Sequence, residues 1–276
     1  MKHGVRNLIL FAVVTLTCGF VGAGVNALTG AEKPMEGLGT LVWLMSPLAT
    51  HLLLRAFGGD GWRGAGFGLG GRKAWPAYLA AIGMTLLATA IAFVVALALG
   101  IVTLNGAPGG SEALIATVGA ALAAAAVKNI FEEGAWRGYL TPQLEALRVP
   151  APLAWVVTGV IWAGWHIPYY LYFVDPQELA RQTTLSPVAL IGLALLILPL
   201  QSIAYGELRL RSGSIWPAWL MHTVANAVGT LLFVGGFVAP VSGLSALLSP
   251  GTEGIVYGVL LGAFGLALWR ARKRDE

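Results

Sequence analysis

Residues 113–130 read ALIATVGAALAAAAVKNI, a run composed almost wholly of small and apolar side chains. An α-helix needs about 20 such residues to cross the hydrocarbon core of a bilayer. Leu, Ala, Val and Gly at this length lack the short alternation of barrel strands. The stretch therefore predicts a membrane helix. The FEEGAWR segment (131–137) that follows it brings three charges to the end of that helix, or inside it.

The rest of the chain repeats this pattern. Of its 276 residues, 57% are hydrophobic and 11% are charged, against roughly 25% charged in soluble domains. We predict an all-α, polytopic membrane helical bundle with spans near 7–28, 38–56, 76–104, 113–134, 152–173, 186–206, 214–237 and 253–270. We expect one integral-membrane domain over 1–276, with N-terminal spans in 1–110, motif-bearing spans in 113–230, and the last span and a basic tail in 253–276. The first apolar stretch is long for a signal peptide, so we expect it to remain as a helix.

The basic residues predict the orientation, because Lys and Arg concentrate in cytoplasmic loops. Alternate ends and loops hold nearly all of them: Lys2, Arg6, Arg55, Arg63, Arg72, Lys73, Arg137, Arg148, Arg209, Arg211, Arg270, Arg272, Lys273 and Arg274. The opposite loops hold only Lys33 and Arg181. We therefore expect both termini to be cytoplasmic, in a bacterial plasma membrane.

Several features favour plain structural interpretations. The loop GGDGWRGAGFGLGGRK (58–73) contains a formal GxGxxG, but no strand precedes it, so we expect a flexible loop near anionic lipid rather than a nucleotide site. No nucleic-acid partner is expected. Cys18, the one cysteine, is expected to be a buried small hydrophobe. The charged tail after the last span is interpreted as a stop signal. The remaining acids and histidines at span ends are expected to be solvated: His3, His51, Glu112, Glu207 and Glu253.

Ionisable side chains within spans are candidates for function, since each is unfavourable in hydrocarbon. Three clusters qualify: Glu132, Glu133 and Arg137; His166; and His222 with Asn226. Glu132 and His166 both lie 17 positions from Val149, where two spans join, so an antiparallel hairpin puts them at one height. His222 follows Ser214 by eight residues, about 12 Å along a helix. The three clusters can therefore meet nearer the cytoplasmic face.

Each polar residue also has a structural explanation when taken alone. Glu133 and Arg137 are four apart and can form a purely structural ion pair. An intramembrane His or Asn often only joins helices. Together, however, a carboxylate beside an imidazole can activate water, and a second His with an Asn can donate to an oxyanion. We expect Glu132 to face His166, with Trp162 as a wall of the pocket, and no residue of this set is a plausible nucleophile.

Three motifs resemble those of one family. They are EEGAWR (132–137), fitting EExxxR; WAGWH (162–166), an aromatic residue four before a His; and HTVAN (222–226), fitting HxxxN. Their order and spacing resemble the CAAX-protease and bacteriocin-processing (CPBP, or Abi) intramembrane endopeptidases, which include the type II CAAX prenyl endopeptidases. The resemblance covers about 128–230. Trp162 stands where Phe is common.

The resemblance implies a catalytic set of Glu132, His166, His222 and Asn226. Glu132 would act as general base on a water polarised with His166, and His222 with Asn226 would stabilise the oxyanion. Glu133 and Arg137 would hold the site in shape. No cofactor or metal is expected, although a Glu/His/His zinc site is stereochemically feasible and a metal-dependent mechanism stays open.

The expected function is intramembrane hydrolysis of a peptide bond, near the C-terminus of a protein, prenylated or not, or in a peptide precursor. Partners would be that substrate, lipidated or not, and membrane lipids. Two alternatives from other classes are a non-catalytic immunity or scaffold protein of the same fold and a proton-coupled transporter. The absence of an internal repeat weighs against the transporter.

Overall fold

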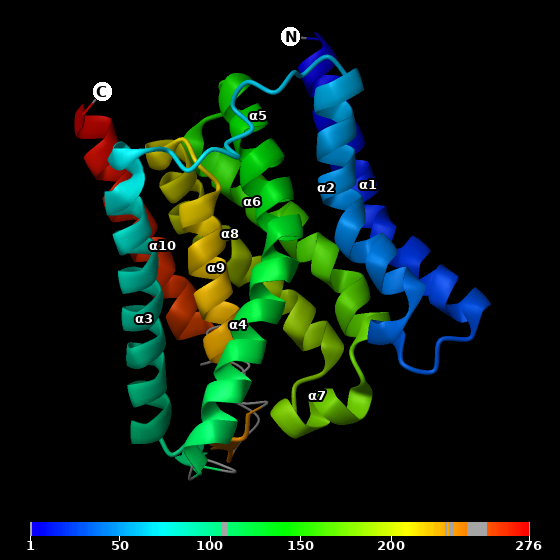
Figure 1. The fold of residues 1–276 in the computed structure, drawn as a ribbon, viewed down its shortest axis with the longest axis vertical. Helices are drawn as coiled ribbons and strands as arrows, with labels where there is room; N and C mark the ends of the chain where they lie inside the picture. The colour runs from blue at the N-terminus through cyan, green and yellow to red at the C-terminus, as the bar shows by residue number, and fades with distance from the viewer. Residues whose placement is uncertain (1, 106–109, 230, 232–234, 242–252, 276) are drawn as a thin grey trace.

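The protein is a bundle of helices in a computed structural model that describes residues 2–105, 110–229, 231, 235–241 and 253–275. The elements in order are α1 (Lys2–Thr29), η1 (Pro34–Glu36), α2 (Leu38–Phe57), η2 (Arg72–Ala74), α3 (Trp75–Ala98), β1 (Val102–Leu104), α4 (Gly110–Ala135), η3 (Trp136–Leu140), α5 (Thr141–Ala146), α6 (Ala151–Pro168), η4 (Tyr169–Phe173), α7 (Pro176–Gln182), α8 (Pro187–Ser212), α9 (Trp216–Gly229), β2 (Val238–Pro240) and α10 (Ile255–Asp275). The predicted class is confirmed. The two ends of the chain lie at the same end of the bundle (Figure 1).

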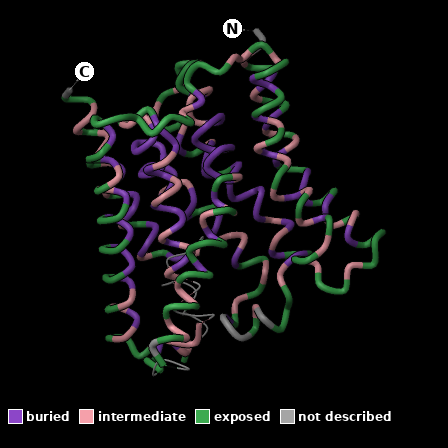
Figure 2. Tube along the Cα trace, in the orientation of Figure 1, coloured by how far each residue is buried: buried purple, intermediate pink, exposed green. Residues whose placement is uncertain are grey.

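Within the described residues, six helical segments are long and apolar enough to cross a membrane: 4–29, 38–57, 72–98, 112–146, 187–212 and 255–274. The expected spans at 152–173 and 214–237 are not among them. α9 has 14 residues, and the predicted span 214–237 continues from it into positions 230 and 232–234, which lie outside the described residues. α6 and α9 both pack within the protein, and buried positions cluster along them and along α8 (Figure 2).

Close helix contacts form where a glycine faces its neighbour. α6 and α10 both pack on α8, α4 packs on α9, and α1 packs on α2. A Cβ on Gly159 of α6 would lie 2.3 Å from the backbone of Pro199 in α8, and one on Gly39 would lie 1.9 Å from the carbonyl oxygen of Gly22. Without side chains there, the backbones approach closely, as small residues allow in membrane proteins.

The predicted span 76–104 is shorter than expected. α3 stops at Ala98 because Gly100 takes a left-handed φ of +65° and the Ile101 N–H returns to the Ala96 carbonyl, a glycine-terminated helix end. β1 then pairs antiparallel with β2, Val102 opposite Pro240. The strands and the short helix α7 were not predicted.

Several residues expected to be solvated are buried. His51 and Glu207 are fully buried. Glu207 receives a bidentate ion pair from Arg272, at 2.8 Å to Nε and 3.1 Å to Nη2, so the basic tail is more than a stop signal. Glu253 is half-buried and accepts a hydrogen bond from the Tyr170 hydroxyl. Glu112 is exposed and Cys18 is buried, as predicted, and the side chain of His3 lies outside the described residues.

Candidate active site

The FEEGAWR segment lies at the change from α4 to the π-helical turn η3. Glu132 and Glu133 lie in the last turn of α4, and Arg137 lies in η3. All three side chains are at most 2% exposed. A π-turn holds one residue more than an α-turn, so it changes the direction of the following side chains, and such turns often occur at functional sites. A second π-turn, η4, directly follows α6, the helix that contains His166.

Glu133 links Arg137 to α9. Its Oε1 lies 3.1 Å from Arg137 Nη1 and 2.8 Å from His222 Nδ1. The predicted Glu133–Arg137 ion pair is confirmed, and the contact with His222 was not predicted. The Arg137 guanidinium also stacks on two rings, 4.6 Å from the centroid of Trp162 and 4.4 Å from that of Tyr205. Buried cation–π contacts of this kind stabilise the folded state by about 2 kcal/mol.

Glu132 is held by α4 itself and by α6. Its Oε2 accepts a hydrogen bond from Trp162 Nε1 at 3.0 Å, and its Oε1 lies 2.8 Å from the Lys128 ammonium. Lys128 is the partly exposed member of this pair, with 43% of its side chain accessible. Trp162 is a shared neighbour of Glu132 and His166, because its Nε1 donates to Glu132 and its carbonyl oxygen lies 2.9 Å from His166 Nδ1. The expected facing of Glu132 and His166 stays a prediction.

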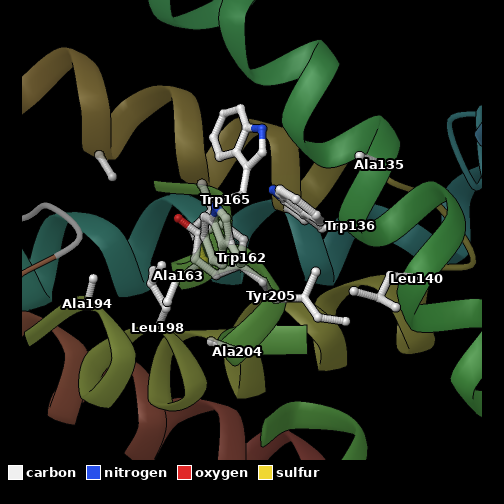
Figure 3. Close-up of a cluster of buried hydrophobic side chains, with 14 of the residues drawn as sticks. Ala135, Trp136, Leu140, Trp162, Ala163, Trp165, Ala194, Leu198, Ala204 and Tyr205 are labelled. Atoms are coloured by element: carbon white, nitrogen blue, oxygen red, sulfur yellow. The ribbon is translucent and has the colours of Figure 1, made fainter. Parts of the chain in front are cut away.

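Trp162 lies among the site residues. Its ring centroid is 6.4 Å from that of His166 and 5.4 Å from that of His222. Trp162 thus contacts the Glu132 carboxylate and both histidine rings. Figure 3 shows Trp162 of α6 beside Trp165 of the same helix, Trp136 of η3 and Tyr205 of α8. The three predicted clusters therefore do meet, around an aromatic centre.

The hydrogen bonds of His166 and His222 define which ring nitrogen can still bond to a water or a substrate. His166 Nδ1 lies 2.9 Å from the Trp162 carbonyl oxygen, which can only accept, so Nδ1 carries the proton. His222 Nδ1 faces the Glu133 carboxylate in the same sense. In the neutral rings Nε2 is then an acceptor, and protonation of either ring makes Nε2 a donor.

Asn226 is oriented by a second asparagine. Its Nδ2 donates to Asn129 Oδ1 at 3.1 Å, which leaves its other N–H for a different acceptor. Asn129 is fully buried and its own Nδ2 has no acceptor among the described residues. Asn129 and Lys128 were not predicted as site residues, although they lie three and four positions before Glu132 on one helix face. Tyr205 gave no signal in the sequence.

A zinc site would need three ligand side chains that converge on one point. In the described part of the chain, no three His, Cys, Asp or Glu side chains converge in a way that could hold a metal ion. Both Glu132 oxygens already face donors of the protein. As arranged, the residues do not fit a three-ligand zinc site.

Comparison with known proteins identifies the region that contains this site. A family model described as "Rce1-like: Type II CAAX prenyl endopeptidase Rce1-like" matches residues 114–228, which include all six predicted site residues. No curated protein matches the chain. The family implies a protease that acts on a peptide or protein. The resemblance drawn from the three motifs is thus confirmed: residues 114–228 of the chain are similar to the Rce1-like type II CAAX prenyl endopeptidases.

Proposed function

We propose that the protein is an intramembrane endopeptidase in which Glu132 activates the hydrolytic water. Glu132 takes a proton from water, and the resulting hydroxide attacks the scissile carbonyl carbon. The proton then passes to the leaving amine as the C–N bond breaks, so that water and one peptide bond give one carboxylic acid and one amine. Positioned proton transfer of this kind contributes about 10²–10⁴-fold to rates.

The remaining residues have separate proposed roles. Nε2 of His166 accepts a hydrogen bond from the water. The free N–H of Asn226 and Nε2–H of protonated His222 donate to the tetrahedral oxyanion. The Glu133 carboxylate, 2.8 Å from His222, compensates for the imidazolium charge, and Arg137 compensates for Glu133.

One observation carries this proposal: a buried carboxylate and two histidines, each held through Nδ1, surround one tryptophan. The cysteine that could serve as a nucleophile, Cys18, lies buried in α1 and bonds instead to main-chain oxygens. A water nucleophile with a glutamate base therefore accounts for the set. The proposed substrate is a peptide segment, with or without a lipid, that reaches the site from the cytoplasmic side of a bacterial membrane.

The test is cleavage of a peptide panel by purified protein, with products identified by mass spectrometry. Glu132→Gln keeps the shape of the side chain but removes the base, and we expect loss of cleavage with an unchanged unfolding midpoint. Glu112→Gln, an exposed change on the same helix, serves as the control. Full activity of Glu132→Gln would overturn the proposal. A folded wild type that cleaves nothing would favour the immunity or scaffold alternative.

Metal dependence and topology need separate measurements. Elemental analysis of the active protein, with a chelator titration, decides between the metal-free and metal-dependent mechanisms: stoichiometric zinc whose removal abolishes cleavage would replace the metal-free proposal. For topology, we expect reporter fusions at both termini to read out as cytoplasmic.

A further inference from the structure

Two buried arginines outside the three motifs connect the glycine-rich loop to the motif helix. Arg55, at the end of α2, is 3% exposed, and Arg209, near the end of α8, is 5% exposed. The loop 58–71 runs between α2 and α3 across the end of the bundle where both chain ends lie (Figure 1). It was predicted to be flexible, and the structure instead shows it bonded to several helices.

Arg55 joins the loop to the π-turn through its two Nη atoms. Nη1 donates to the main-chain oxygens of Gly61 at 2.7 Å and Arg63 at 3.2 Å, and Nη2 donates to the Gly138 oxygen at 2.7 Å. Nε donates to Nε2 of buried His51 at 2.7 Å. The planar guanidinium therefore bridges the loop and η3 in a way that a lysine could not reproduce.

Arg209 repeats this arrangement from the opposite side. Its Nε donates to the Arg137 main-chain oxygen at 2.8 Å, and its Nη2 donates to the Gly64 oxygen. A Cβ on Gly66 would lie 2.7 Å from the Arg209 guanidinium, and Gly66 has φ +76°. Gly66 begins the formal GxGxxG, so close contact with Arg209 explains a glycine that superficially resembles a phosphate loop.

The two arginines thus bind consecutive carbonyls of the π-turn, those of Arg137 and Gly138. Arg137 is also the residue whose side chain pairs with Glu133, and Glu133 contacts His222. Burial of two guanidinium groups against main-chain oxygens is unfavourable unless every bond is well formed. An arrangement of this kind holds the backbone of η3 at one position relative to the loop, α2 and α8.

We propose that Arg55 and Arg209 are positioning residues of the active site, which hold the π-turn so that Arg137, Glu133 and His222 keep their alignment. This inference rests on the proposed peptidase function, because it assigns the alignment a role in turnover. A displacement of the order of 1 Å at a reacting group reduces rates by about 10²-fold. The expected effect of Arg55→Gln or Arg209→Gln is a kcat lower by about 10- to 100-fold, with KM changed little.

The experiment combines this kinetic split with two readouts that do not need peptidase activity. The chain has four histidines, so the imidazole ¹⁵N signals of His222 can be assigned by single substitutions. In folded Arg55→Gln and Arg209→Gln we expect these signals to shift, and trypsin to cut after Arg63 faster than it does in the wild type. Arg72→Gln, an exposed change beside the same loop, should leave the signals, the cleavage pattern and kcat unchanged.

The outcomes separate the two proposals. Unchanged His222 signals and kcat in both arginine variants would overturn the positioning role, even with an active wild type. If the wild type cleaves no peptide, the proposed function fails while the His222 and trypsin readouts still decide whether the arginines align the site. Arg209→Lys covers the case in which the glutamine variants do not fold: we expect the same His222 shift, and wild-type signals there would contradict the proposal.

Discussion

Replacement of Arg137 by methionine tests the central charge pair of the site. Arg137 is fully buried, with its Nη1 3.1 Å from Glu133 and its guanidinium carbon over the rings of Trp162 and Tyr205. Removal of one partner from a buried ion pair lowers the free energy of unfolding by about 3–5 kcal/mol, since the other charge stays buried. Methionine fills much of the same volume, so a cavity contributes little. We expect a loss in this range for Arg137→Met.

The assay is an SDS-induced unfolding titration in mixed micelles, followed by the fluorescence of the tryptophans around the site. Glu133→Gln in the same chain removes the charge that Arg137→Met leaves unpaired. The double variant should therefore be more stable than the sum of the two single losses predicts, by at least about 1 kcal/mol, the coupling typical of contacting residues. Arg63→Met, on the exposed loop surface, is the control. A loss below about 1 kcal/mol in Arg137→Met, or strict additivity, would refute this account of the pair.

Three further changes test neighbouring contacts. Asn129→Leu frees the Asn226 amide to rotate, so we expect kcat to fall by about 10- to 100-fold with KM retained, measured by peptide cleavage; an unchanged kcat would contradict the proposed orientation. Lys128→Met leaves Glu132 with one donor, and we expect kcat to fall by about tenfold, whereas Lys128→Arg keeps most activity; equal rates for both would contradict a role for the charge. Burial raises the pKa of Glu253 from 4.5 to about 7, so the folded state binds its proton more tightly and stability falls as pH rises from about 4.5 to 7. Glu253→Gln should match the wild type below pH 4.5 and unfold at a higher SDS fraction at pH 8; a lower midpoint at pH 8 would be the opposite result.

The sequence predicted those features that depend on local spacing. The length of the apolar runs identified the long helices of the bundle. The four-residue spacing identified the Glu133–Arg137 ion pair. The equal counts from Val149 correctly put Glu132 and His166 in one site. The same spacing rule also reaches Lys128 from Glu132, although that pair was not predicted.

Features that depend on tertiary contacts or on backbone deviations were not predictable. The contact between Glu133 and His222 joins residues 89 apart, and only the packing of α4 against α9 creates it. The π-turn η3 has no sequence signature, yet it places the Arg137 guanidinium over the rings of Trp162 and Tyr205. His51 and Arg55 looked like a span end, because apolar periodicity does not describe the loop and η3 that supply the acceptors of Arg55. His51 is buried as a further acceptor of Arg55.

The bidentate pair between Arg272 and Glu207 has a practical consequence for handling the protein. Judged by composition, the residues after the last apolar stretch are a natural place to shorten the chain or to fuse a tag directly. A truncation before residue 272 would leave the fully buried Glu207 carboxylate without its arginine. Expression variants designed for crystallisation or labelling should therefore retain α10 through Asp275 and place any affinity tag beyond a spacer.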